Sequence, residues 1–178
     1  WVSRAAGRHG PVMLMYHAVT PGRHVPNWPW AVSAARFEAQ LDALQAGGWH
    51  TVTQSELAGD TRLPARTVAI TFDDGYVDNL SACEALARRG MCATWFIVSG
   101  FIGQTPEWTA DGRPPQRLLD ASELRDMLRA GMEIGAHSVS HRRLTELDDM
   151  TLEAEVADSR STLEALLGTP VSSFAYPY

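Results

Sequence analysis

The fold class of this chain follows from one stretch, Thr67-Val68-Ala69-Ile70-Thr71-Phe72-Asp73-Asp74-Gly75. Its first six residues are β-branched or apolar, so they predict a strand at 67–72 that ends at the two aspartates. A helix is expected to follow through about Arg89 and to end at Gly90. Strand and helix alternate in the same way on both sides of this stretch, which is typical of an α/β protein with a parallel sheet.

The other expected elements follow from the same periodicities. Further strands are expected at 12–16, 50–53, 93–98, 132–136 and 171–175. Further helices, counted with their caps, are expected at 33–47, 120–131 and 151–168, and loops at 20–32 and 99–118. The strand at 12–16 is apolar throughout and is expected to be buried. This alternation is compatible with an open doubly wound sheet and with a barrel.

Composition narrows the class of protein. The 178 residues are 45% hydrophobic and 20% charged, which suits one globular domain and excludes a disordered tail or a coiled coil. The net charge of −6 and the lack of a basic run argue against nucleic-acid binding. The longest fully apolar run, Val12–Tyr16, is too short to cross a bilayer. No glycine-rich phosphate loop follows an expected strand. The only two cysteines, Cys83 and Cys92, are expected to be buried free thiols and not a disulfide.

Polar residues follow four expected strands at the point where each strand ends. They are His17, Asp73 with Asp74, His137, and the group Tyr176-Pro177-Tyr178. The carboxyl ends of parallel strands share one rim, where barrel enzymes build their active sites. His141 lies four residues after His137, so that both imidazoles could face one ion. Two imidazoles and one carboxylate suit Zn²⁺, Co²⁺ or Ni²⁺ with room for water, and the second carboxylate can serve as a base.

Each of these features has a plainer interpretation when it is taken alone. An Asp-Asp-Gly tripeptide is often a turn, and a pair of histidines four residues apart is more often solvated or packed than ligating. A single histidine such as His17 is often a packed core residue. Their joint placement at strand ends favours the catalytic interpretation. Three loop tryptophans could stack on sugar rings or pack in the interior, namely Trp28, Trp30 and Trp108.

The motifs Thr71–Gly75 and His137–His141 resemble those of polysaccharide deacetylases with NodB homology, which form carbohydrate esterase family 4. The stretches Pro11–His17 and Phe174–Tyr178 are similar to the branch that contains the poly-N-acetylglucosamine deacetylases. The resemblance implies a distorted (β/α)₇ barrel. It also implies an enzyme, a hydrolase of non-peptide carbon–nitrogen bonds. Such an enzyme removes N-acetyl groups from a polysaccharide containing N-acetylglucosamine, depends on a metal, and releases acetate.

The resemblance also implies a role for individual residues. The metal ligands would be Asp74, His137 and His141. Asp73 would be the general base and His17 the general acid. The backbone N–H of Tyr178 would donate a hydrogen bond to the oxyanion. Many family members carry an arginine where Ala175 stands here. The branch that contains the poly-N-acetylglucosamine deacetylases also lacks this arginine, so that another group must orient the base.

An acetylated polysaccharide is the implied partner, and a bacterial cell envelope or the extracellular space is the implied location. The domain is expected at 11–178 after an extension at 1–10, and to be truncated, because the chain stops inside an expected strand. Two alternatives stay open. One is a metal-dependent esterase that removes O-acetyl groups from a glycan such as acetylxylan, and the other is an inactive glycan-binding module. The intact ligand and base residues argue against the module.

Overall fold

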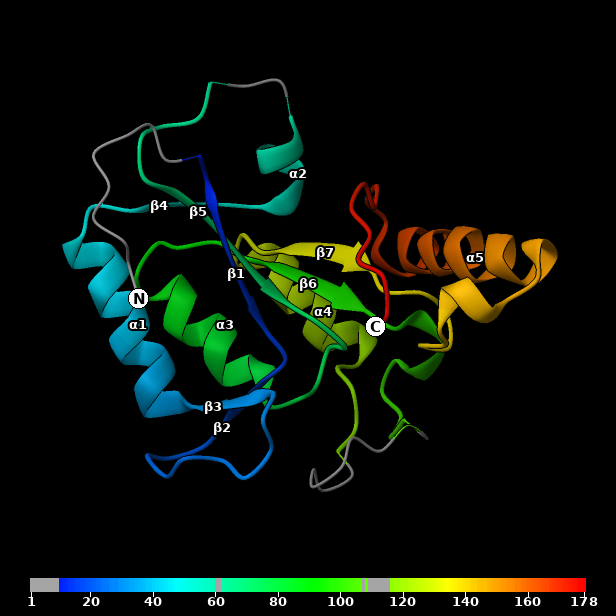
Figure 1. Ribbon diagram of the computed structural model, residues 1–178, viewed down its shortest axis with the longest axis horizontal. Coiled ribbons are helices and arrows are strands. Elements are labelled where there is room, and N and C mark those ends of the chain that lie inside the picture. The colour runs from blue at the N-terminus through cyan, green and yellow to red at the C-terminus, as the bar shows by residue number, and fades with distance from the viewer. Residues whose placement is uncertain (1–9, 60–61, 107, 109–115) are drawn as a thin grey trace.

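The computed structural model describes residues 10–59, 62–106, 108 and 116–178. As the sequence predicts, the chain is an α/β protein whose paired strands run parallel (Figure 1). The main sheet contains β1 (Val12–Tyr16), β4 (His50–Val52), β5 (Thr67–Phe72), β6 (Thr94–Ile97) and β7 (Glu133–Ala136). A separate pair contains β2 (Ala18–Thr20) and β3 (Ala31–Ser33). The described strands leave the main sheet open, and the closed barrel stays a prediction.

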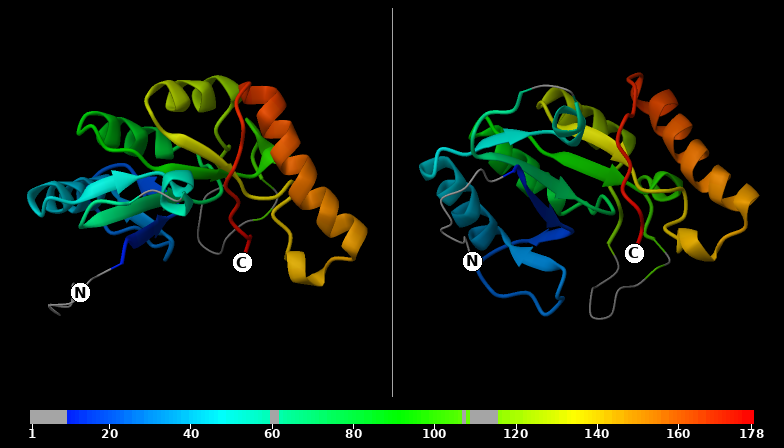
Figure 2. Two further views of the ribbon diagram at one scale, coloured as in Figure 1. Left: turned by 90° about the horizontal axis from the view of Figure 1, so that it is seen from above. Right: turned by 45° about the horizontal axis from the view of Figure 1, so that its top comes forward.

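The described residues also contain five helices and two 3₁₀ turns, of which η2 and α5 follow the last strand. The helices are α1 (Ala34–Ala46), α2 (Gln54–Ala58), α3 (Asn79–Ala87), α4 (Ala121–Arg129) and α5 (Asp149–Leu167), and the turns are η1 (Ser99–Phe101) and η2 (Leu144–Glu146). Helix α1 packs beside α3, and α4 beside α5 (Figure 1). Figure 2 shows α3 and α4 on the same side of the sheet. None of the helices in the described ranges combines the length and apolarity needed to span a bilayer.

Strand β5 forms the centre of the sheet and buries all six of its residues. On one side β1 pairs along its whole length, and on the other side β4 pairs with its first half and β6 with its second half. A strand covered in this way favours β-branched and apolar residues at every position. Phe72 at its end stacks on Trp95 of β6, with ring centroids 4.4 Å apart. This packed strand delivers the two aspartates to the rim.

Strand β1 forms where the sequence predicts it, but the prediction that it is buried is wrong. Met13 and Met15 are 53% and 54% exposed. Among the described strands β1 pairs with β5 alone and forms an edge of the sheet. A local apolar pattern predicts the strand, whereas its burial depends on neighbours that come from elsewhere in the chain.

Smaller differences concern the loops and the last strand. Strand β3 forms inside the loop expected at 20–32, and the loop expected at 99–118 begins with η1 and lies partly outside the described residues. The strand expected at 171–175 is reduced to one parallel bridge between Phe174 and Ala136. Both cysteines are free thiols, as expected, but only Cys83 is buried, and the prediction of burial is wrong for the partly exposed Cys92. Residues 1–9 of the expected N-terminal extension lie outside the described residues.

The start of α5 also differs from the expected one. The helix begins two residues before Thr151, because Asp148 caps it by accepting a hydrogen bond from the Thr151 amide at 3.0 Å. It ends where expected, at Gly168, which adopts the left-handed φ of 70°. Helix α5 therefore has nineteen residues, and it packs against β7, η1 and α4.

Candidate active site

The ends of β5 and β7 bring two imidazoles to one carboxylate. Asp74 follows β5, His137 follows β7, and His141 comes after a short loop. Oδ1 of Asp74 is 3.1 Å from Nε2 of His141 and 3.5 Å from Nε2 of His137. All three side chains are buried or nearly so. The residues expected to bind a metal are thus close together, as one possible metal-binding group.

A hydrogen bond fixes which nitrogen His137 presents to the site. Its Nδ1 lies 2.9 Å from the carbonyl oxygen of Ala175. A carbonyl oxygen can only accept, so Nδ1 carries the proton and Nε2 of the neutral ring keeps a free lone pair. Metal-binding histidines are usually oriented by such a bond from the other ring nitrogen. The segment after α5 therefore orients the His137 ring through a backbone carbonyl.

The donor set fits a divalent cation. Two ligands at 2.0–2.1 Å from a tetrahedral ion lie about 3.4 Å apart, close to the separations around Asp74. Oδ1 of Asp74 is buried and makes no hydrogen bond of good geometry among the described residues. A buried acceptor without a partner is costly, and a bound cation would remove that cost. The choice among Zn²⁺, Co²⁺ and Ni²⁺ is not fixed by these contacts.

The two neighbouring carboxylates have different proton affinities. Burial raises the pKa of Asp74, but the imidazoles of His137 and His141 outweigh burial and hold that pKa well below its usual range. Burial also raises the pKa of Asp73, and the imidazoles of His137 and His17 offset only part of this rise. Asp74 is therefore suited to remain a charged ligand, and Asp73 to accept a proton.

The backbone around the ligands is strained. Asp74, Ser138 and His141 adopt the left-handed φ values of 71°, 65° and 59° although none is glycine. Such residues each cost on the order of 1 kcal/mol and gather at functional sites. Gly75 has a φ of 83°, and a Cβ there would lie 2.6 Å from Cδ1 of Ile97. A glycine is therefore required directly after the aspartates.

His17 lies on the opposite wall, beside Asp73. Its ring packs near Trp30 and Trp28, with centroids 5.3 and 6.3 Å apart. Its backbone carbonyl accepts a hydrogen bond of 2.9 Å from Nδ2 of Asn79, whose Oδ1 in turn accepts one of 3.2 Å from Nε1 of Trp95. The segment after β1 is thereby fixed to the core with its imidazole facing the cavity.

Sequence reasoning missed the role of Asn79. This residue is fully buried on the same stripe of α3 as Ala82, Cys83 and Leu86. A polar residue on an apolar helix face was the available signal, because buried amides must find hydrogen-bond partners.

All the site residues predicted from the sequence line one cavity of about 630 Å³. It is lined by Asp73, Asp74, His17, His137, His141 and Tyr178, together with Met15, Trp28, Pro29, Trp30, Tyr76, Trp108 and Tyr176. Trp28 is buried, whereas Trp30, Tyr176 and Tyr178 are 57%, 72% and 71% exposed at the rim. Of the loop tryptophans, Trp28 thus packs in the interior, whereas Trp30 is exposed at the rim. Exposed rings around a polar centre suit a ligand with both apolar faces and polar groups.

Two further rings lie against the second histidine ligand. Trp108 stacks on His141 with centroids 4.6 Å apart, and Tyr178 lies 5.0 Å away on another side. The guanidinium of Arg143 lies 4.5 Å from the centroid of the Tyr178 ring. These contacts place the Tyr178 ring next to the candidate ligand His141, while the role of the Tyr178 backbone N–H as an oxyanion donor stays a prediction.

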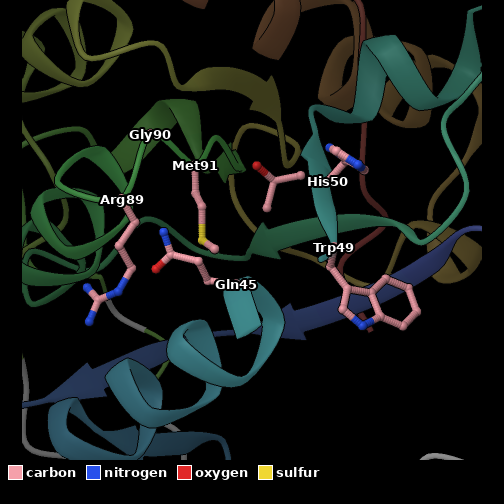
Figure 3. A pocket seen from close by; sticks show the side chains of 7 residues that line it. Gln45, Trp49, His50, Arg89, Gly90 and Met91 are labelled. Carbon is pink, nitrogen blue, oxygen red and sulfur yellow. The ribbon is translucent and has the colours of Figure 1, made fainter. Parts of the chain in front are cut away.

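A second cavity of about 260 Å³ opens near the starts of β4 and β6, at the opposite end of the sheet (Figure 3). It is lined by Gln45, Trp49, His50, Thr51, Arg89, Gly90 and Met91. The guanidinium of Arg89 is paired with Asp42 at 2.8 Å and with Glu38 at 3.3 Å, both on α1. This charge therefore holds the end of α3 against α1 and is not directed to a ligand.

The chain is similar in sequence and in structure to known proteins, among them a polysaccharide deacetylase. The YxkH protein of Bacillus subtilis (strain 168) is 28% identical over 182 residues, which cover 99% of this chain and 59% of that protein. Among solved structures, IcaB from Ammonifex degensii is similar at 27% identity and a TM-score of 0.76, over 95% of this chain and 74% of that one. BC0361, a polysaccharide deacetylase from Bacillus cereus, is similar at 26% identity and a TM-score of 0.76, over 94% of this chain and 50% of that one.

The family model described as polysaccharide deacetylase matches residues 60–178, which include the aspartate pair and both histidines. The chain spans 59% of the length of its curated relative YxkH. With the match covering most of the chain and the paired motifs assembled in one cavity, the chain belongs to the polysaccharide deacetylase family.

Proposed function

We propose that residues 11–178 belong to the catalytic domain of a metal-dependent deacetylase, which hydrolyses N-acetyl groups on a polysaccharide containing N-acetylglucosamine. One observation carries this proposal. The ligand set of Asp74, His137 and His141 lies beside a second, more basic carboxylate, Asp73, in one cavity. Ligands and a free base in such an arrangement are what hydrolysis of an acetyl group requires.

The proposed chemistry assigns one task to each group. A bound divalent ion, proposed to be Zn²⁺, would supply Lewis acidity toward water and the acetyl carbonyl. Asp73 accepts the proton of the attacking water. The backbone N–H of Tyr178 donates to the acetyl oxygen as negative charge develops on it. Acetate and a free amine on the sugar are the products.

The position of His17 supports an amide as the substrate. An amine leaves an amide poorly unless its nitrogen is protonated, so N-deacetylation needs an acid near the leaving group. His17 lines the cavity on the wall formed after β1, together with Trp30. A protonated imidazole at this place can donate to the leaving nitrogen while Asp73 acts on the water.

The rim of the cavity supports a glycan as the substrate class. The exposed rings of Trp30, Tyr176 and Tyr178 offer flat apolar faces around a polar centre. Such faces pack against the C–H faces of sugar rings. The stretch Pro11–His17, which resembles the poly-N-acetylglucosamine branch, supports that polymer in particular. We place the enzyme in the cell envelope or outside the cell, where such polymers are found.

Acetate release from defined glycans tests the proposal. The Zn²⁺-loaded protein should release acetate and expose amines on oligomers of N-acetylglucosamine. Acetate release from acetylxylan alone would instead indicate an O-acetyl esterase. A protein that binds both glycans but releases acetate from neither would contradict the proposed catalysis and indicate a binding module.

His17→Ala should slow deacetylation of an N-acetylated oligosaccharide by about 10²–10⁴-fold, because the leaving amine loses its proton donor. Hydrolysis of an aryl acetate should fall much less, since an aryloxide leaves without protonation. Both rates and the metal content are measured on the same preparation. His50→Ala, in the exposed start of β4, is the matched control and should match the wild type. Equal losses on both substrates would contradict the assignment of His17 as the acid.

A further inference from the structure

The loop between the two histidine ligands is tied on one side to η1. The carbonyl oxygens of Ser138 and Val139 accept hydrogen bonds of 3.1 and 2.9 Å from the amides of Ser99 and Gly100. A Cβ on Gly100 would lie 2.5 Å from the Val139 oxygen, so the two segments are as close as glycine allows. The carbonyl groups of this loop are therefore satisfied from η1.

The amides of the same loop are tied on the other side to Glu155 of α5. One oxygen of its carboxylate, Oε2, accepts hydrogen bonds from the amides of Val139 at 2.8 Å and Ser140 at 2.9 Å. The other oxygen, Oε1, accepts from the Ser140 hydroxyl. Glu155 is buried, and burial raises its pKa, but these hydrogen bonds outweigh burial and keep that pKa below its usual value. A charged carboxylate is thus held inside the protein by loop donors.

The conformation of the loop decides where the second ligand points. Ser138 and His141 both adopt left-handed φ values, and the His141 amide donates a 3.0 Å hydrogen bond to Oγ of Ser138. Non-glycine residues leave this conformation unless neighbouring contacts hold them. His137 has its own anchors at the end of β7 and at Ala175. The ring of His141 packs on Trp108, whereas the position of its backbone depends on the contacts of the loop that precedes it.

We propose that Glu155 is the positioning residue for His141, and that it sets the affinity of the site for its metal ion. This inference rests on the proposed metal-dependent function. Glu155 bonds to the loop backbone and to Ser140, so it acts on the ion through the position of the imidazole. Residues that orient metal ligands typically change metal affinity by about 10–100-fold when they are replaced.

Two variants and one control separate this role from general stability. Glu155→Ala removes the carboxylate that accepts hydrogen bonds from the two loop amides and from the Ser140 hydroxyl. Glu155→Gln keeps one carbonyl oxygen for the two amides, and its NH₂ can donate to the Ser140 hydroxyl, so it should rescue most of the loss. Glu153→Ala removes an exposed carboxylate from the same helix and leaves the loop untouched. Zn²⁺ affinity is measured by competition with a chelator, and amide exchange of Val139 and Ser140 is measured in the metal-free protein.

Glu155→Ala should weaken Zn²⁺ binding by about 10–100-fold and speed exchange of the two loop amides. Excess Zn²⁺ should restore its activity, because the three ligands remain, and Glu155→Gln should lie close to the wild type. Equal Zn²⁺ affinity in Glu155→Ala and Glu153→Ala would overturn the inference and leave the proposed function intact. A wild type that binds no Zn²⁺ would overturn both.

Discussion

Asp73→Asn should slow acetate release by about 10²–10⁴-fold while the protein keeps its metal. Asparagine preserves the shape of the side chain but cannot accept the proton of the attacking water. Burial gives Asp73 a raised pKa, which suits a base and not a permanently charged ligand. The turnover number on an N-acetylated oligosaccharide and the Zn²⁺ content of the same sample are the two measurements.

Asp74→Asn is the matched comparison, because it alters the neighbouring carboxylate by the same single atom. We expect it to lose metal and activity together, since Oδ1 of Asp74 lies closest to both imidazole nitrogens. Loss of metal in Asp73→Asn with retention in Asp74→Asn would show that the roles of the two aspartates are exchanged.

His137→Ala should abolish both stoichiometric metal binding and deacetylation. The substitution leaves only Asp74 and His141 from the set of three proposed ligands. The wild type should contain one divalent ion per chain by elemental analysis, and chelation should inactivate it reversibly. Zn²⁺ added after chelation should restore activity in the wild type and not in the variant.

His50→Ala serves again as the control, because this histidine lies at the opposite end of the sheet. It should retain the ion and the activity. Undiminished metal binding by His137→Ala would contradict the proposed site, whatever the activity of the variant.

The sequence predicts the central strand and its aspartates well because local and tertiary preferences agree there. Every residue of β5 is buried, so composition, periodicity and burial all indicate the same element. Strand β1 has the same apolar composition, yet its two methionines are exposed at the edge of the sheet. Local patterns report what a segment can form, while burial depends on which segments lie beside it.

The rest of the candidate site could not be predicted from local patterns for a related reason. Asn79 bonds to the backbone of His17, which lies 62 positions away in the sequence. Glu155 bonds to the backbone of Val139 and Ser140, which lie 16 and 15 positions away. Nothing in the sequence near His17 or His141 indicates which side chain will hold that backbone. His17 and His137 are predictable because they follow strands, and parallel strands end at a common rim. His141 is predictable from its spacing of four residues after His137.

We expect the C-terminal segment and the proposed metal site to be coupled thermodynamically through the carbonyl of Ala175, which bonds to Nδ1 of His137. That segment is held on β7 by hydrogen bonds between Ala136 and both Ser173 and Ala175 (Figure 1). While it stays docked, His137 keeps the tautomer and rotamer that bind a cation. Linkage is reciprocal. If an ion binds the docked state tenfold more tightly than the undocked state, its binding therefore stabilises the docked state by about 1.4 kcal/mol. In the proposed enzyme, the bound ion would therefore also stabilise the packing of the last segment against the sheet.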